Sequence, residues 1–180
     1  MIDVAEDLDQ DGLVACARAL GTLLQGGEVL LLDGAMGAGK TTFTRALAAG
    51  LGVDRPDRVT SPTFALCMIH PGPIRLLHLD LYRLPEADAD DGEGAALGVQ
   101  AAAEALGLDS DELAGEDRAV VVEWPDRWIS PPEDHLRIAI LRPRGTLTQR
   151  HIRALAGGPK SSELLSRWRQ RVSSEIRNSL

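Results

Sequence analysis

The sequence predicts an α/β fold in which helices cover both faces of a mainly parallel sheet with an antiparallel hairpin portion. Two continuous aliphatic runs, Val29–Leu32 and Ala119–Val122, have the length and composition of strands buried on both faces. A glycine-rich loop and a helical pattern follow the first run directly. Two further apolar segments between residues 63 and 81 are separated by turn residues. Strands that alternate with helices in this way are typical of a parallel sheet.

Length and composition favour a single globular domain. The chain has 180 residues, of which 44% are apolar and 26% charged, so a mainly disordered chain is excluded. No aliphatic stretch approaches the ~20 residues of a membrane span, and the acidic N-terminus does not resemble a signal peptide. We therefore expect a cytoplasmic protein without membrane contact. Cys16 and Cys67 lie in apolar runs, which predicts buried reduced thiols rather than a disulfide or zinc site.

The net charge of −8 is unevenly distributed along the chain. Residues 1–150 contain 25 acidic and 13 basic residues, a net charge of −12, whereas residues 151–180 contain two acidic and six basic residues, a net charge of +4. An acidic main domain repels a phosphodiester backbone, so we expect no DNA binding and only indirect contact with RNA. The C-terminal segment alone has a charge suited to direct RNA contact.

The N-terminal elements follow from hydrophobic periodicity. Apolar residues spaced as on a helix predict a helix over Asp11–Leu24, which Gly26 and Gly27 terminate. A second helix is expected over Thr41–Leu51, with Gly52 as its C-cap.

Later elements are less regular. Thr63–Ile69 and Ile74–Leu81 predict a β-hairpin or a bent strand pair, and the carboxylate-rich residues 86–94 predict a solvated loop. Residues 98–118 suggest a helix and an acidic connection. The alternation of Leu136, Ile138 and Ile140 predicts a half-buried strand, while residues 152–156 fit either strand or helix.

The C-terminal residues form a separate unit in the predicted organisation, with a main domain at residues 1–157 and a basic helical tail at 158–180. Apolar residues at every fourth position among arginines predict an amphipathic helix over Ser161–Ile176. Two alternatives remain for it: a terminal helix docked on the main domain, or an arm that contacts a partner or RNA.

The segment Gly34–Thr41 fits the pattern G-x-x-x-x-G-K-[ST] of a phosphate-binding P-loop, which makes the expected fold P-loop NTPase-like. Backbone N–H groups of the loop and the following helix N-terminus would face phosphate oxygens. Lys40 would reach the β- and γ-phosphates, and the Thr41 hydroxyl would ligate Mg²⁺. The only asparagine is Asn178, so no Asn-Lys-x-Asp guanine motif is present, and ATP is favoured over GTP.

A P-loop also requires an acid at the carboxyl end of a neighbouring strand, to orient Mg²⁺ or polarise water. Glu123 follows the run Ala119–Val122, and Asp80 ends the segment Leu76–Asp80. Both are candidate catalytic residues. His78, two residues before Asp80, would share its strand face and fits a structural hydrogen bond better than proton transfer.

Several motifs together resemble one family, the small bacterial P-loop ATPase TsaE, also called YjeE. In order, they are GAMGAGKTTF at Gly34–Phe43, SPTF at Ser61–Phe64, HLDLYRL at His78–Leu84, Leu97-Gly98 and EWPDR at Glu123–Arg127. The motifs after the P-loop are the more specific ones. The resemblance covers about residues 10–157. It departs at Ala35-Met36, where the family commonly has Asp-Leu, and in a longer stretch between Leu97-Gly98 and Glu123.

The resemblance implies a set of site residues. Nucleotide binding would involve Gly34, Met36, Gly37, Ala38, Gly39, Lys40, Thr41, Thr42, Thr63, Trp124 and Arg150. Thr41 and Glu123 would hold the metal, and Asp80, Glu123 and Lys40 would be catalytic. The residues leave open which of the two acids orients water.

The resemblance further implies Mg²⁺-dependent ATP hydrolysis, stimulated by a partner complex similar to the family's TsaD–TsaB pair, in the synthesis of threonylcarbamoyladenosine on tRNA. Two alternatives are a small-molecule kinase and a non-catalytic ATP-sensing scaffold. Kinases of this size usually close an arginine-bearing lid over the acceptor, whereas residues 86–94 are rich in carboxylates.

Overall fold

The computed structural model describes residues 1–62, 65–84, 113–128 and 130–178. The described strands are β1 (Ile2–Leu8), β2 (Val29–Asp33), β3 (Cys67–His70), β4 (Arg75–Asp80), β5 (Arg118–Glu123), β6 (Leu136–Leu141) and β7 (Arg150–Ala156). The described helices are α1 (Gln10–Gly21), α2 (Lys40–Leu51) and α4 (Pro159–Asn178), with short 3₁₀ turns η1 (Pro56–Arg58) and η3 (Pro125–Arg127).

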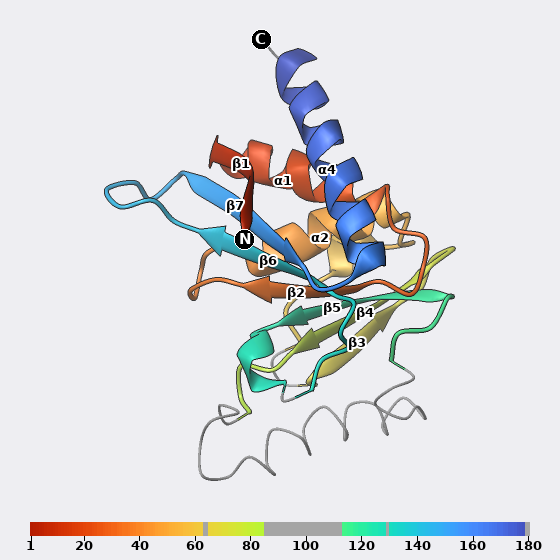
Figure 1. The fold of residues 1–180 in the computed structure, drawn as a ribbon. Helices are drawn as coiled ribbons and strands as arrows, with labels where there is room; N and C mark the ends of the chain where they lie inside the picture. Colours follow the sequence, from red (N-terminus) through yellow and green to blue (C-terminus); the bar gives the residue numbers. More distant parts are fainter. Residues whose placement is uncertain (63–64, 85–112, 129, 179–180) are drawn as a thin grey trace.

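The strands form one mixed sheet in the order β1-β7-β6-β2-β5-β4-β3 (Figure 1). Its four central strands, β6, β2, β5 and β4, are parallel to their neighbours within this set, and antiparallel pairs close both edges. The predicted hairpin forms one edge as β3 and β4. The parallel centre confirms the expected fold class and brings the carboxyl ends of β2, β4 and β5 to one edge of the sheet.

The two faces of the sheet bury different sets of side chains. Leu30 and Leu32 of β2 pack on the face that carries α1, α2 and α4, whereas Val29 and Leu31 pack on the opposite face. Strand β5 alternates in the same way. Because both faces of these strands are buried, both strands consist of uninterrupted aliphatic residues.

All three described α-helices pack on one face, above the sheet in Figure 1. In the described part, the other face is covered by Leu113, Trp128 and residues around them. Of the segment expected to be helical, 98–118, residues 98–112 lie outside the described residues. The predicted loop at 86–94 also lies outside them. Helical cover of the second face therefore stays an expectation.

Several element boundaries differ from the predicted ones. Helix α1 ends at Gly21 rather than at Leu24, since the Leu23 and Leu24 N–H groups donate to the carbonyls of Leu20 and Gly21, three residues back instead of four. Strand β3 begins only at Cys67, after Leu66 adopts a left-handed conformation with φ 59°. Residues 150–156 are a strand, which resolves the helix-or-strand ambiguity.

Strand β1 is absent from the sequence-based prediction. It pairs antiparallel with β7 at the edge of the sheet, with irregular register on either side of Ala5. Its exposed carboxylates, including Asp3 and Glu6, disrupt a simple alternation of apolar and polar residues. An edge strand with one solvated side tolerates such a sequence, so periodicity alone could not detect it.

Helix α4 is docked through its apolar side. Leu164, Leu165, Trp168 and Val172 belong to the same buried cluster as α1 and α2. The Trp168 ring meets Phe43 edge to face at 6.2 Å, and its indole nitrogen donates to the Cys16 carbonyl at 2.9 Å. Of the two alternatives for the tail, docking therefore holds for this part of the helix.

Both cysteines are free thiols, as expected, although Cys67 is only half-buried. Burial raises the pKa of the Cys67 thiol to about 11, so this side chain is an unreactive thiol at neutral pH. In the described part of the chain, no helix is both long and apolar enough to cross a membrane.

Candidate nucleotide site

The P-loop joins the end of β2 to the start of α2 and requires glycine for steric reasons. Gly34 has φ 153°, and a Cβ there would lie 2.8 Å from the Ile140 carbonyl oxygen of neighbouring β6. Gly39 has φ 114° and caps the N-terminus of α2. A side chain at Gly34 would push the loop away from β6, and one at Gly39 would require a strained backbone and meet Leu13 of α1 at 2.9 Å.

Lys40 is folded back into its own loop. Its ammonium nitrogen donates to the carbonyls of Gly34 at 2.7 Å and Ala35 at 3.3 Å, and lies 3.9 Å from the centroid of the Trp124 ring. Burial lowers the pKa of the Lys40 ammonium, against the opposing attraction of nearby carboxylates, of which Glu123 is the strongest. The lysine is thus a partly desolvated cation held by groups that an anion can replace.

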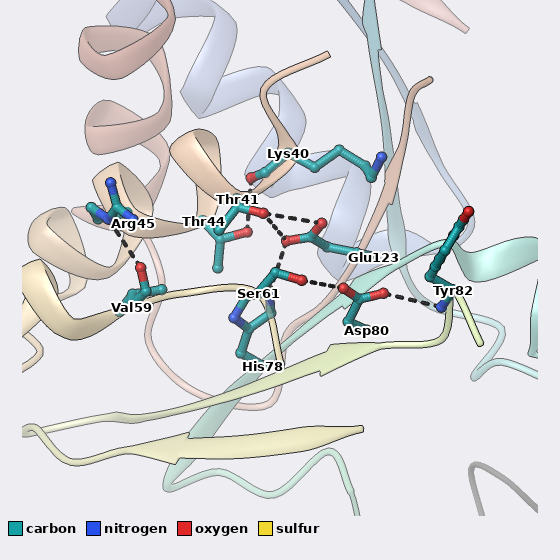
Figure 2. A network of polar contacts seen from close by, with 10 residues as sticks. All are labelled: Lys40, Thr41, Thr44, Arg45, Val59, Ser61, His78, Asp80, Tyr82 and Glu123. Atoms are coloured by element: carbon teal, nitrogen blue, oxygen red, sulfur yellow. Dashed lines mark hydrogen bonds and ion pairs between the residues drawn. The ribbon is translucent and has the colours of Figure 1, made fainter. Parts of the chain in front are cut away.

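Glu123 receives hydrogen bonds from two different elements (Figure 2). The Thr41 hydroxyl, in the first turn of α2, donates to its two carboxylate oxygens at 3.1 and 3.4 Å. His78 Nε2, from β4, lies 2.9 Å from Oε1. Glu123 is almost completely buried, so these bonds replace the water that a carboxylate would otherwise require.

Asp80 stands beside Glu123, because the two residues are register partners on the parallel strands β4 and β5. Its carboxylate accepts from the Ser61 hydroxyl and, at 3.0 Å, from the Tyr82 backbone N–H. Side chains of Leu76 and His78 precede it on the same face of β4. The candidate acids therefore replace apolar residues at the ends of two strands that otherwise line the core.

These groups converge on a cavity of about 420 Å³. It is lined by Met36, Gly37, Gly39, Lys40, Thr41, Thr42, Ser61, Asp80, Tyr82, Glu123 and Trp124. A second cavity, of about 440 Å³, lies at the opposite ends of β2 and β6 and includes none of these residues. The polar groups typical of phosphate chemistry thus gather at the carboxyl ends of the strands.

An aromatic and cationic cluster forms one side of the site. The rings of Tyr82 and Trp124 lie 5.0 Å apart, and the Arg127 guanidinium lies 5.3 Å from the Tyr82 ring. Trp124 has φ 61°, a left-handed conformation that is uncommon for a bulky side chain. This turn directly after β5 carries the indole toward Lys40.

Two arginines hold the P-loop from the side of β6 and β7. Arg150 Nε donates to the Ala38 carbonyl at 2.6 Å, and Arg142 donates to the Gly37 carbonyl. Burial, and then the proximity of Arg142, lower the pKa of Arg150. Arg150 also lines a neighbouring cavity of about 600 Å³ together with Gly37, Gly39 and Thr42.

The predicted residues separate into four groups by position. Most line the 420 Å³ cavity, and Arg150 lies against the P-loop. Gly34 and Ala38 shape the loop without lining the cavity, and the Ala38 N–H is engaged by the Ala35 carbonyl. Thr63 lies outside the described residues.

Sequence reasoning missed some residues at the site. Ser61 and Tyr82 fall within the SPTF and HLDLYRL motifs but received no role. Arg142 carries no local signal at all, because it reaches the P-loop only through the pairing of β6 with β2. The His78 contact with Glu123 matches the structural hydrogen bond expected for this histidine.

Comparison with known proteins agrees with the motifs. The family described as "Threonylcarbamoyl adenosine biosynthesis protein TsaE" matches residues 8–152. A Streptomyces coelicolor protein named tRNA threonylcarbamoyladenosine biosynthesis protein TsaE is 40% identical over 133 residues, which cover 71% of this chain and 78% of the relative. The protein of the same name from Bacillus subtilis is 42% identical over 130 residues, covering 71% of this chain and 70% of the relative.

A solved structure supports the fold. The crystal structure of Bacillus subtilis YdiB superposes with a TM-score of 0.64 at 24% sequence identity, covering 92% of this chain and 93% of that one. The family match ends within β7, so α4 lies beyond it. Over residues 8–152, which include the central strands of the sheet and all the site residues described above, this chain belongs to the TsaE family of threonylcarbamoyl adenosine biosynthesis proteins.

Proposed function

We propose that this chain binds and hydrolyses ATP with Mg²⁺ and that this activity supports threonylcarbamoyladenosine formation on tRNA. Family membership supports the role in threonylcarbamoyladenosine biosynthesis. One observation carries the nucleotide chemistry. Lys40 and Thr41 of the P-loop face Asp80 and Glu123, two acids at adjacent strand ends, across a single cavity.

The residues present fit ATP and Mg²⁺. The Lys40 ammonium is held by neutral carbonyls and an aromatic face, which phosphate oxygens can replace with a stronger charge-assisted interaction. A threonine hydroxyl and a carboxylate are hard oxygen ligands, which Mg²⁺ prefers in combination with substrate phosphates. Thr41 and Glu123 already lie within hydrogen-bonding distance of each other.

The proposed reaction is hydrolysis of the γ-phosphate. Water attacks the γ-phosphorus in line, the bond to the bridging oxygen breaks, and ADP and phosphate are released. Lys40 and the loop N–H groups stabilise the charge on the phosphate oxygens. Mg²⁺, when bound, neutralises further charge on the β- and γ-phosphates.

The hydrogen bonds around the two acids favour different roles for them. Glu123 contacts Thr41, the residue proposed to hold the metal, so Glu123 is placed to hold the metal as well. Asp80 is held by the Ser61 hydroxyl and by the Tyr82 backbone N–H, next to Glu123 on the neighbouring strand. We assign the orientation of the attacking water to Asp80 and metal binding to Glu123.

Phosphate release by the purified chain tests the site. Lys40→Ala should abolish ATP hydrolysis, because it removes the one cation that faces the cavity from the P-loop. Lys160→Ala is a matched control, since Lys160 is the only other lysine and is exposed in α4. Full turnover by Lys40→Ala would contradict the assignment.

The division of roles between the acids is tested by isosteric variants. Asp80→Asn should lower turnover while retaining Mg²⁺-dependent ATP affinity, measured by titration calorimetry. Glu123→Gln should weaken the dependence of that affinity on Mg²⁺. The reverse pattern would exchange the two roles.

We further propose that the ATPase acts through a partner complex similar to TsaD–TsaB and meets tRNA only through it. The net charge of −12 over residues 1–150 supports indirect contact. A pull-down with and without ATP, followed by phosphate-release measurement, tests this. Binding without turnover in the complex would identify a scaffold, and stoichiometric phosphorylation of a metabolite would identify a kinase.

A further inference from the structure

We propose that His78 is a positioning residue that orients the Glu123 carboxylate for Mg²⁺ binding. This inference rests on the proposed function and adds a residue that supports the proposed metal site. His78 lies on the central strand β4, and its imidazole is completely buried. Among the described residues, the one hydrogen bond of this ring is the 2.9 Å contact with Glu123 Oε1.

The geometry follows from strand register. His78 is paired with Val121 on β5, so Glu123 lies two residues further along on the same face. This diagonal arrangement allows the ring to reach the carboxylate from the side of the sheet, whereas Thr41 reaches it from α2. Two rigid elements thus fix a side chain that has three rotatable bonds.

The chemistry assigns the proton on the ring. A buried carboxylate oxygen is an acceptor, so the 2.9 Å contact requires His78 to donate from Nε2. The other ring nitrogen, Nδ1, has no hydrogen-bond partner among the described residues. Among the described residues, Glu123 Oε1 therefore accepts from His78 and, at 3.1 Å, from the Thr41 hydroxyl, while Oε2 has the longer Thr41 contact at 3.4 Å.

This asymmetry determines what Glu123 can do. Oε1 is occupied by donors, so Oε2 keeps the greater acceptor capacity for a metal ion or its bound water. Without the donor from β4, the carboxylate could rotate about its terminal bond and lose this preference. Groups that hydrogen-bond to a metal ligand typically change metal affinity or activity by about 10–100-fold when removed.

The test compares side chains that do and do not preserve the donor. His78→Gln places an amide N–H near the position of Nε2, whereas His78→Asn is one methylene shorter and His78→Leu has no donor. Calorimetric titrations of ATP with increasing Mg²⁺, and in EDTA, give the half-saturating Mg²⁺ concentration and the metal-free affinity. Circular dichroism and thermal unfolding establish that each variant is folded.

His70→Leu is the matched control. His70 is another buried histidine, 6.3 Å from His78 between ring centroids, and its Nε2 likewise has no partner among the described residues. It has no contact with Glu123 in the structure, so replacing it introduces the same leucine into the same region without touching the site. Its half-saturating Mg²⁺ concentration should equal that of the wild type.

We expect His78→Leu and His78→Asn to raise the half-saturating Mg²⁺ concentration about tenfold or more, with ATP affinity in EDTA unchanged. His78→Gln should stay close to the wild type. If His78→Leu does not fold, the Gln and Asn pair still decides the question. Adding His78→Asn to Glu123→Gln should cause no further loss, because the histidine acts through the carboxylate.

Two results would overturn the inference: an unchanged Mg²⁺ requirement in His78→Asn, or equal losses in the Asn and Gln variants. If the wild type itself binds ATP without any Mg²⁺ dependence, the proposed metal site fails and the inference fails with it. If the wild type depends on Mg²⁺ and His78→Asn behaves identically, only the role of His78 is refuted.

Discussion

The Lys40 ammonium lies over the face of the Trp124 ring, 3.9 Å from its centroid, at the mouth of the proposed phosphate site. The same nitrogen is bonded to the Gly34 carbonyl. A cation over an indole face is held by about 0.5–2 kcal/mol, which a phosphate can outcompete. The P-loop lysine is therefore kept near its place of action by a contact that ATP can displace.

This relationship predicts a spectroscopic signal. ATP binding should draw Lys40 from the indole and change the tryptophan emission, measured by steady-state fluorescence titration. Trp124→Phe should bind ATP with affinity within a few-fold of the wild type but lose most of this change. Trp128→Phe should retain it, because Trp128, although it belongs to the same apolar cluster as Trp124, does not line the cavity. An undiminished change in Trp124→Phe would contradict the displacement.

Ser61 supports Asp80 through its hydroxyl, which donates to Oδ2. Ser61→Ala should reduce ATP turnover about tenfold or more, because one hydrogen bond that orients the proposed water-binding carboxylate is lost. ATP affinity should change much less. Ser61→Thr keeps the hydroxyl and should restore most of the turnover. Equal turnover in the alanine variant and the wild type would show that the Ser61 hydroxyl is not required to orient Asp80.

Docking of α4 through Trp168 predicts a large effect on stability. Trp168→Ala should lower the free energy of unfolding by about 3–5 kcal/mol, the usual cost of deleting a buried aromatic side chain. Urea denaturation measures this. Arg169→Ala, at the next and exposed position, should change stability by less than about 0.5 kcal/mol. Similar midpoints for the two variants would mean that α4 is an arm in solution.

Asp117, directly before β5, gives a prediction for the pH dependence of stability. The side-chain hydrogen bond from Arg75, and then that from Arg118, lower the pKa of the Asp117 carboxyl to about 2. A lowered folded-state pKa stabilises the protein above the unfolded value of about 3.9 and loses this effect as the pH falls toward 2.

Asp117→Asn should therefore be slightly less stable than the wild type at neutral pH, with a difference that shrinks below about pH 4. The effect should be small because Asp117 is exposed. Thermal unfolding across this pH range measures it. Asp57→Asn is the control, since Asp57 contacts Arg55 only at 3.8 Å and both side chains are solvated. If the stability difference between Asp117→Asn and the wild type does not change with pH, the ion pairs of Asp117 with Arg75 and Arg118 are not its source.

Much of the fold was predictable because its signals are local. The run Val29–Leu32, the loop Gly34–Lys40 and the periodicity of Thr41–Leu51 each lie within a few residues of sequence, and the structure reproduces them as β2, the P-loop and α2. Strand β1 and the antiparallel edge it forms with β7 escaped prediction. Their pairing joins residues about 150 positions apart, and no local pattern encodes it.

By itself, the sequence determined the phosphate-binding loop, its lysine and the two acids that end aliphatic strands, because glycine spacing and a charge after an apolar run are local chemistry. Only the tertiary structure decided how these groups meet. The parallel register of β4 and β5 sets Asp80 beside Glu123 and brings the His78 ring to the Glu123 carboxylate. The order of β6, β2 and β5 carries Arg142 to the P-loop, and burial of Trp168 fixes α4. Such contacts depend on strand order and burial, which arise only when distant segments pack into one sheet.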